Sequence, residues 1–526
     1  MKRKLIALCL CCAMLLGIGA PCLAEGELVG NMYTTGFPVL KETETFTIAV
    51  TKDPSSLNSF GDKECVKKTN ELTNINIDWL DIPAASWTEK VGIMIAGEDL
   101  PDAFLGRDVD IMSNQEMFLP LTDMIYKYCP NIVEMLEADP RIKGAITAPN
   151  DGQIYCLPTN KDNPSDSVSG ILWVNPDWLE KLGLSVPTTT DEFVAMLRAF
   201  KTQDPNGNGI ADEIPLAIQQ SEQTRWMYYL MGSFGAVDNA DHVYSKDGKT
   251  VTFGPTEPGY LEGLRWLHDL YAEGLINDDC FTIDEAQLTA KAQQPDTLLG
   301  SMIYWIPDAM DSRYANYITV PPLAGPDGTR MWIANRAPLG AMRGFSITKA
   351  CKHPEALLRY YDACLSSFEM IMEWQWGPEG AGCWKRVPEQ GEFAWTQTME
   401  FVPADMSQAY FKRTVCGSIY SPNYLWSKWA DLEVADERNA KKRAGNKAAL
   451  EVCVEAMPNG LDDPERAAEI NLLKVDIDSY VQRFFASAVT KGITDEEWAA
   501  HLENCKKLRV DEYVSLWQEY YTSKKQ

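Results

Sequence analysis

The chain has 526 residues, of which 45% are hydrophobic and 23% charged, a composition typical of a globular protein and not of a disordered one. Because this length exceeds what one compact core accommodates, we expect two lobes, each with its own core. The net charge of −27 repels nucleic acid and anionic lipid headgroups, which argues against a nucleic-acid partner.

Residues 1–24 have the pattern of a secretory signal peptide. Three basic residues precede an apolar run from Leu5 to Ala20, and small residues lead to a cleavage position before Glu25. This run is shorter than the roughly 18 residues needed to span a bilayer, and no later stretch without charges reaches that length. We therefore expect an exported, soluble protein that begins near Glu25.

Ten cysteines follow the signal segment, and they are scattered singly with no C-x-x-C pair. An exported protein permits disulfides, but pairing cannot be derived from this spacing. Both bridges and buried thiols therefore remain open.

Strand patterns and helix patterns alternate along the first part of the mature chain, after a polar leader at residues 25–45. This alternation of strands and helices favours a layered α/β fold. The expected strands are residues 46–50, 74–80, 101–106 and 152–158, and the expected helix is 87–96.

A second α/β segment begins near residue 165. A buried strand at 171–174 precedes Asn175 as a helix cap and Gly183 as the helix stop. Thr189 and Glu192 have capping-box spacing before a further helix. Further strands are expected at 214–218, 298–305 and 344–348, and helices at 260–274 and from Pro354 onward.

The segment from Asp204 to Glu213 has the ligand spacing of a calcium loop around a sharp glycine turn. Pro215 replaces the usual twelfth ligand of an EF-hand, and an Asn/Gly-rich turn with solvated acids explains the residues equally well. The candidate oxygen ligands are those of Asp204, Asn206, Asn208, the Ile210 carbonyl, Asp212 and Glu213.

Aromatic residues are abundant, with 16 tryptophans and 21 tyrosines. Flat rings stack on the C–H faces of sugars, although for any single ring core packing is the commoner role. Catalytic patterns are weak: the four histidines form no metal-binding motif, and no nucleophile elbow, P-loop or dinucleotide fingerprint is present. We expect no enzyme activity and name no catalytic residue, although a pair of glycosidase carboxylates would leave no sequence motif.

Three segments together resemble the family 1 extracellular solute-binding proteins of ABC sugar importers. They are residues 172–184 (LWVNPDWLEKLGL), residues 187–193 (PTTTDEF) and the Asn-rich loop. The resemblance continues through residues 97–104, 151–155, 270–276 and 376–380, and spans most of residues 45–385. Long Gram-positive carbohydrate-binding lipoproteins and alginate-oligosaccharide binders are the most similar subgroup.

The resemblance implies a hinged, two-lobed periplasmic-binding-protein-like fold of type II with a central cleft. The first lobe would comprise residues 46–160 plus about 340–385, and the second residues 165–338 plus about 390–526. Ligand closes such a cleft by contacting both lobes, and a permease recognises the closed shape. In this subgroup the Asp-x-Asn loop holds a structural calcium away from the cargo.

The resemblance also implies the ligand-binding residues and the partners. We expect the monomeric receptor to deliver an oligosaccharide to ABC permease subunits, with a secreted carbohydrate-active enzyme or a peptide receptor as the alternatives. Cys22 follows Gly-Ala-Pro and thus departs from a lipobox, which argues against a lipid anchor on this extracytoplasmic protein. The candidate binding residues are Trp226, Tyr229, Tyr304, Trp305, Arg107, Asp108, Trp376 and Glu379.

Overall fold

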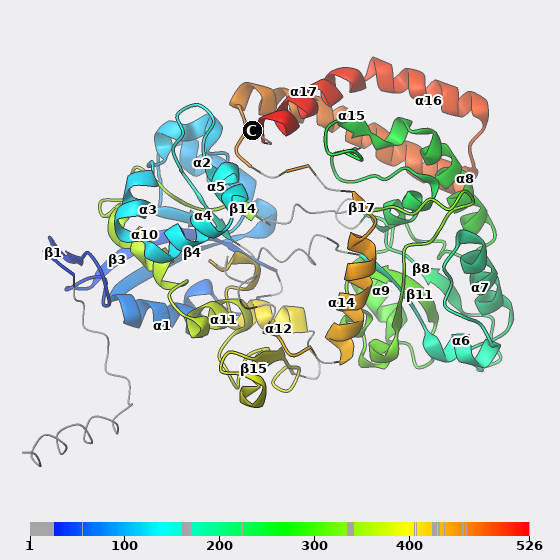
Figure 1. The fold of residues 1–526 in the computed structure, drawn as a ribbon, viewed down its shortest axis with the longest axis horizontal. Helices are drawn as coiled ribbons and strands as arrows, with labels where there is room; N and C mark the ends of the chain where they lie inside the picture. The colour runs from blue at the N-terminus through cyan, green and yellow to red at the C-terminus, as the bar shows by residue number, and fades with distance from the viewer. Residues whose placement is uncertain are drawn as a thin grey trace, which may run out of the picture.

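A computed structural model describes most of the chain. The described residues are 26–54, 56–159, 168, 170–221, 225–333, 341–403, 406, 408–422, 429, 432–435, 437–454, 457–458 and 460–524, without the side chains of 341–343, 409, 419 and 438. The signal segment, Cys22 and most of the expected crossovers near 158–170 and 337–343 lie outside the described residues. Figure 1 shows two lobes, and each has its own large hydrophobic core.

The first lobe is built on a five-stranded mixed sheet with strand order β4-β3-β5-β14-β6. Strand β3 is parallel to β4 and β5, while β14 is antiparallel to β5 and β6. The buried run Phe46–Val50 forms the centre of β3, as predicted. The strands are β3 (Glu44–Lys52), β4 (Ile75–Pro83), β5 (Ala103–Leu105), β6 (Leu157–Thr159) and β14 (Ala341–Ile347).

Helices cover this first sheet. Helix α2 has the bounds that its spacing predicts, whereas the strand expected at 152–158 is confined to the short β6. Helices α4, α5 and α10 each begin with a proline, which lacks the amide hydrogen that would be unsatisfied at that position. The helices are α1 (Glu64–Thr73), α2 (Trp87–Ala96), α3 (Thr122–Tyr128), α4 (Pro130–Ala138), α5 (Pro140–Ile146), α10 (Pro354–Ala363) and α11 (Phe368–Trp376).

The second lobe is built on a four-stranded sheet with strand order β12-β7-β11-β8. Strands β8 and β11 are parallel, and β7 is antiparallel to both β11 and β12. The strands are β7 (Ile171–Val174), β8 (Ile214–Ala217), β11 (Leu299–Tyr304) and β12 (Ile318–Val320). The helices are α6 (Pro176–Leu182), α7 (Thr190–Thr202), α8 (Pro258–Ala272) and α9 (Glu285–Ala292), with a 3-10 segment, η5, at Trp226–Phe234.

The predicted helix caps of this lobe are largely confirmed. Asn175 Oδ1 accepts from the Asp177 amide at 3.0 Å, and α6 ends where Gly183 adopts φ +65°. Thr189 caps α7 by accepting from the Glu192 amide at 3.2 Å. The Glu192 carboxylate accepts from the Thr188 amide at 2.8 Å and the Thr188 hydroxyl at 2.9 Å, and the amides of Thr188 and Thr189 both lower its pKa.

The chain leaves the first lobe later than expected. Strands β15 (Trp384–Arg386) and β16 (Trp395–Gln397) form a hairpin, and α12 (Gln408–Val415) lies beside it below the first sheet (Figure 1). Cys416 and Tyr420 belong to the first core, and the Val434 amide donates to the Trp395 carbonyl at 2.6 Å. The return to the second lobe therefore follows residue 434, whereas the sequence suggested about 390.

Helix α14 (Glu437–Leu450) then packs on β7 and β12. Strand β17 (Cys453–Val454) pairs with β13 (Trp332–Ile333). The Leu461 amide donates to the Ala145 carbonyl of the first lobe at 2.8 Å, so the chain contacts that lobe once more. The last helices, α15 (Pro464–Lys491), α16 (Asp495–Lys507) and α17 (Val510–Ser523), pack against the second lobe (Figure 1).

The ten cysteines of the mature chain all lie in described segments, and the structure joins none of them in a disulfide. Nine of them are buried. Burial in apolar surroundings raises the pKa of the Cys65 thiol to about 12, so this thiol is protonated and inert. Within the described segments, no helix combines the length and apolarity of a membrane span.

Candidate functional site

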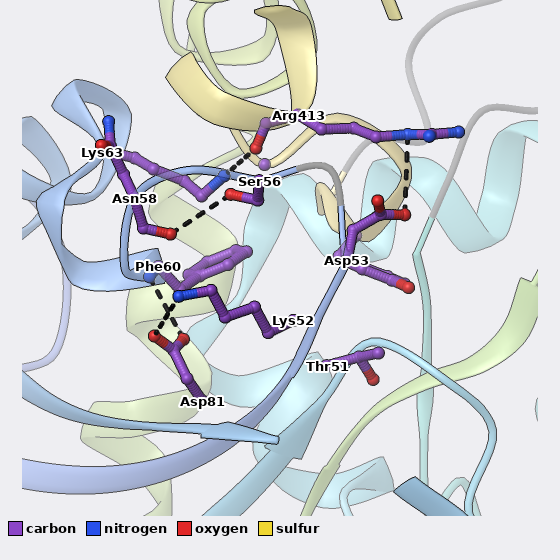
Figure 2. A pocket seen from close by; sticks show the side chains of 11 residues that line it. Thr51, Lys52, Asp53, Ser56, Asn58, Phe60, Lys63, Asp81 and Arg413 are labelled. Atoms are coloured by element: carbon purple, nitrogen blue, oxygen red, sulfur yellow. Dashed lines mark hydrogen bonds and ion pairs between the residues drawn. The ribbon is translucent and has the colours of Figure 1, made fainter. Parts of the chain in front are cut away.

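The carboxyl ends of β3 and β5 define one edge of the first sheet. Because these strands are parallel, the loops that follow them lie close together, as at ligand sites of open α/β sheets. A small cavity of about 10 Å³ lies at this edge (Figure 2). It is lined by Thr51, Lys52, Asp53, Ser56, Asn58, Phe60, Lys63, Asp81, Arg413, Gly417 and Tyr420.

Lys63 fixes the end of α12 to this edge. Its side chain is buried, and its ammonium group donates to the carbonyl oxygens of Arg413 and Cys416, the latter at 2.8 Å (Figure 2). Burial lowers the pKa of Lys63, so the two carbonyl bonds are needed to hold a charged ammonium there. Asp81 accepts from Ser59 Oγ at 2.6 Å and from the Phe60 amide at 3.2 Å, which orders the loop after β3.

Arg107 and Asp108 follow β5, and both are exposed at this edge. The Arg107 amide donates to Thr51 Oγ1 at 3.1 Å. Burial raises the pKa of Tyr420, and the nearby Arg107 guanidinium acts in the opposite direction. The structure thus places both predicted polar residues on the ligand side of the first sheet, and their role in binding stays a prediction.

The corresponding edge of the second sheet carries stacked aromatic rings. Trp226 begins η5 after β8, and Tyr304 ends β11. Their rings stack with centroids 5.2 Å apart, and the Trp305 ring meets Trp226 edge-on at 6.5 Å. Tyr304 donates to Glu285 Oε1 at 3.0 Å. Trp226 and Tyr304 are only 3% and 6% exposed, so Trp305 is the partly exposed ring of the three.

The remaining predicted aromatic residues lie elsewhere. Tyr229 is buried against Trp332, with ring centroids 5.2 Å apart. Trp376 ends the second helix after Pro354, α11, and was expected in a loop; its ring lies 3.5 Å below the Lys412 ammonium. Glu379 forms an ion pair with Arg386 at 3.1 Å. The structure therefore gathers Trp226, Tyr304 and Trp305 at one edge and does not bring Tyr229, Trp376 or Glu379 to it.

Helix α12 connects the two sheet edges. Arg413 Nε lies 3.7 Å from Asp53 Oδ2 at the first edge. Tyr410, three residues earlier and therefore on the same helix face, is 48% exposed. Its hydroxyl is close enough to Tyr304 to raise the pKa of that phenol, although burial is the larger cause. The helix face that pairs with Asp53 of the first lobe thus also lies near Tyr304 of the second lobe.

Sequence reasoning missed four residues of this arrangement: Asp53, Tyr410, Arg413 and Tyr420. Asp53 directly follows a buried strand, and this position at a sheet edge was a usable signal. The other three lie in the late part of the chain that the sequence assigned to the second lobe. No local pattern indicates that they return to the first sheet.

The loop from Asp204 to Glu213 is folded around its own oxygen atoms. Asp204 accepts from the amides of Gly207 and Gly209 at 2.9 and 3.1 Å. Asp212 accepts from the side-chain amides of Asn206 and Asn208 at 3.0 and 3.1 Å. Asn208 also donates to Asp296 at 3.2 Å, a carboxylate that precedes β11 and that sequence spacing did not reveal.

Two observations test whether this loop fits a cation. Glu213 Oε1 is a buried oxygen that accepts no hydrogen bond in the described structure, and burial together with Asp204 and Asp212 raises the Glu213 pKa. Both effects describe a carboxylate that lacks a positive partner. Among the described residues, no three His, Cys, Asp or Glu side chains meet at one point, so a cation here also requires amide and carbonyl oxygens.

Two α/β lobes, each built on its own mixed sheet, are the architecture of two-lobed ligand-binding proteins of type II. The family model described as bacterial extracellular solute-binding protein matches residues 49–367, more than half of the chain, and the chain belongs to this family. It is a solute-binding protein.

Two curated relatives are similar to this chain. The fructooligosaccharide ABC transporter substrate-binding protein FusA of Streptococcus pneumoniae serotype 4 is 29% identical over 509 residues, covering 92% of this chain and 91% of FusA. The polygalacturonan/rhamnogalacturonan-binding protein YtcQ of Bacillus subtilis is 24% identical over 325 residues, covering 59% of this chain and 60% of YtcQ. The similarity to FusA thus extends over both lobes.

Solved structures agree with this fold. The structure of S. pneumoniae FusA in complex with kestose has a TM-score of 0.77 at 26% identity and covers 91% of this chain and 99% of that chain. An EF-hand mutant of FusA in complex with fructo-nystose has the same TM-score at 25% identity, with the same coverage. These similarities confirm the predicted two-lobed α/β fold and the predicted family.

Proposed function

We propose that this chain is the extracytoplasmic receptor of an ABC transporter and that it binds an oligosaccharide between its two sheet edges without changing it chemically. The single observation that carries the proposal is the position of α12: Arg413 pairs with Asp53 at the first edge, and Tyr410 lies near Tyr304 at the second. A ligand beside this face touches both lobes at once. Such a ligand favours the closed arrangement by its differential affinity.

The chemistry of the two edges supports a sugar. The partly exposed ring of Trp305 offers an apolar face, and Arg107, Asp53 and Tyr410 offer hydrogen-bonding groups. A pyranose or furanose needs this combination, because its C–H face is apolar and its rim carries hydroxyl groups. The names of FusA, a fructooligosaccharide ABC transporter substrate-binding protein, and YtcQ, a polygalacturonan/rhamnogalacturonan-binding protein, support the same substrate class.

Isothermal titration tests this proposal with kestose, nystose, trigalacturonate, maltotriose and a set of tripeptides. We expect saturable heat with at least one saccharide and a dissociation constant near 1 μM, which corresponds to about −8 kcal/mol. Product analysis of the same mixtures should detect no cleavage. Turnover of a saccharide would support the carbohydrate-active enzyme instead, and heat with the peptides alone would support a peptide receptor.

The loop from Asp204 to Glu213 is proposed to hold a structural Ca²⁺ ion. The unsatisfied Glu213 oxygen and the carboxylates of Asp204 and Asp212 would supply charge, and the Asn206 and Asn208 amides would turn their oxygens toward the ion. The EF-hand named in the FusA mutant structure supports this assignment. The loop lies before β8, away from the aromatic ring cluster, so the ion would support the fold and not the cargo.

A chelator experiment with a matched variant tests the ion. Removing calcium should lower the melting temperature of the wild type, because an ion that binds only the folded chain stabilises it by mass action. Asp212→Asn should melt at the chelated temperature with or without calcium, and saccharide affinity should change little in either case. A wild-type melting curve that calcium and chelator leave unchanged rules the ion out.

A further inference from the structure

A second concave site lies on α14. It has a volume of about 360 Å³, within the usual range for small-molecule sites, and it is open to solvent. Figure 1 shows α14 along the side of the second lobe that faces the first lobe. The residues that line this α14 pocket are Arg443, Asn446, Lys447, Leu450 and Glu451.

The middle turn of α14 lies close to the aromatic edge. A Cβ atom placed on Gly445 would come within 2.9 Å of Ile171 Cγ2 and 2.7 Å of Thr319 Cγ2, so the helix approaches β7 and β12 as closely as a glycine permits. Ile171 is the cross-strand partner of Tyr304. Paired residues of antiparallel strands point to the same face of a sheet. Helix α14, which carries the pocket, and the Tyr304 side chain therefore lie on one face of the second sheet.

Asn446 has an unsatisfied acceptor beside this pocket. Its side chain is 98% buried, since only 2% of the residue is exposed, and Oδ1 accepts no hydrogen bond in the described structure. A buried amide oxygen without a donor destabilises the folded chain, because it has lost its hydrogen bonds to water without replacement. The χ2 torsion of asparagine is broad, so the amide can turn its oxygen toward the pocket that it lines.

The charges around Asn446 restrict which ligand can satisfy it. Arg443 and Lys447 provide cationic donors at the same wall, while Glu433 pairs with Arg443 and Glu451 adds one carboxylate, so the wall does not select a metal ion or an ammonium group. A carboxylate or phosphate is attracted by these cations but has no hydrogen to donate to Oδ1. A hydroxyl group both donates to the asparagine oxygen and accepts from lysine, and the side chain of Leu450 offers an apolar surface to a sugar ring.

We propose that the α14 pocket is a saccharide subsite in which Asn446 and Lys447 bind adjacent hydroxyl groups of a neutral sugar unit. This inference rests on the proposed function, since it assigns one end of the bound oligosaccharide to α14 while Trp305 stacks on another unit. Arg443 forms an ion pair with Glu433 at 2.5 Å, and Glu433 in turn accepts from Gln397 of β16 at 3.1 Å. These two interactions connect the wall of the subsite to the segment that returns from the first lobe.

The test uses the full mature chain and the saccharide of the titration panel that binds the wild type most tightly. Asn446→Leu removes the acceptor and keeps the approximate volume. Its affinity should fall about five- to tenfold, the size of one neutral hydrogen bond. Its melting temperature without ligand should stay the same or rise, because the unsatisfied buried oxygen is gone. Asn446→Asp keeps an acceptor beside Lys447 and should bind within about threefold of the wild type.

Wild-type affinity in Asn446→Leu would overturn the subsite, whether or not the variant melts at a lower temperature. If that variant does not fold, Lys447→Ala tests the subsite and Lys507→Ala is its matched control. Each of the two removes one exposed lysine charge from a helix. A loss of affinity for Lys447→Ala alone supports the subsite, and equal affinities overturn it. Absence of saccharide binding by the wild type is a different result, which overturns the proposed function itself.

Discussion

The two facing sheet edges differ in how their side chains are held. At the first edge, Arg107 and Asp53 are positioned by hydrogen bonds and ion pairs, and Arg107 is exposed. At the second edge, Trp226 and Tyr304 are buried in the core, and their stacking positions Trp305. The aromatic edge is therefore part of the fold, whereas the polar edge can change with little effect on stability. This difference predicts that substitutions at the aromatic edge lower stability more than substitutions at the polar edge do.

The largest effect is expected for Trp226→Ala, which tests whether the aromatic edge belongs to the core. Removing this buried ring should lower the free energy of unfolding by about 3–5 kcal/mol. Urea unfolding monitored by circular dichroism measures it. Trp305→Ala is the matched control and should lose clearly less stability, and similar losses for the two variants would contradict the distinction.

Trp305→Ala should instead weaken binding. Loss of a stacked ring at the centre of a binding site costs about 2 kcal/mol, which is roughly a 30-fold rise in Kd for the tightest-binding saccharide. Isothermal titration gives this value directly. An unchanged Kd would show that Trp305 does not contact the saccharide, and the second edge would then have no ring that stacks on it.

A histidine in α16 sharpens the comparison because it lies outside both edges. His501 Nε2 lies 2.9 Å from the Pro255 carbonyl, which can only accept, so Nε2 carries the hydrogen and Nδ1 accepts from the Tyr480 hydroxyl at 3.1 Å. Burial lowers the pKa of His501 to about 4, although the hydrogen bond to the Pro255 carbonyl acts in the opposite direction.

The sign of the pH effect follows from that lowered pKa. The unfolded chain takes up a proton near pH 6.5 and the folded chain only near pH 4, so acidification favours unfolding between these values. Between pH 7 and 5, His501 should lower the free energy of unfolding by about 2 kcal/mol. His501→Gln should show a correspondingly smaller difference between urea titrations at the two pH values. An identical pH dependence in the variant would show that other groups cause it.

The smallest effect is expected at the polar edge. Arg107→Met keeps the aliphatic stem and removes the guanidinium, and it should weaken saccharide binding by about 1 kcal/mol while leaving the free energy of unfolding within about 0.5 kcal/mol. Arg141→Met, at an exposed ion pair with Asp139 outside both edges, is the control for lost charge. A loss of stability larger than the loss of affinity would show that Arg107 is structural.

Local patterns predicted the elements well, because caps and apolar spacing act over a few residues. Asn175, Gly183 and the spacing of residues 87–96 gave correct ends for α6 and α2. The family resemblance predicted the two-lobed fold. Contacts between distant segments were not predictable: no pattern near residue 410 shows that α12 packs beside β3, since that contact depends on Lys63 binding two late carbonyls.

The aromatic candidates show the same limit. Trp226, Tyr304 and Trp305 meet because β8 and β11 are parallel neighbours whose carboxyl ends lie at one edge of the sheet. Their meeting can be derived once the strand order is known. Tyr229 lies three residues after Trp226 in the 3-10 segment and is buried against Trp332. Ring composition could not separate these outcomes, because a core ring and a binding ring have the same chemistry.

Hydrogen exchange of the full chain with and without the tightest-binding saccharide tests the central claim most directly. If one ligand contacts both lobes, saturation should slow exchange at the first edge, in residues 53–60 and 106–111, and at the second edge, in residues 226–230 and 304–310, in the same titration. Protection confined to one lobe at saturating ligand would contradict binding between the two edges.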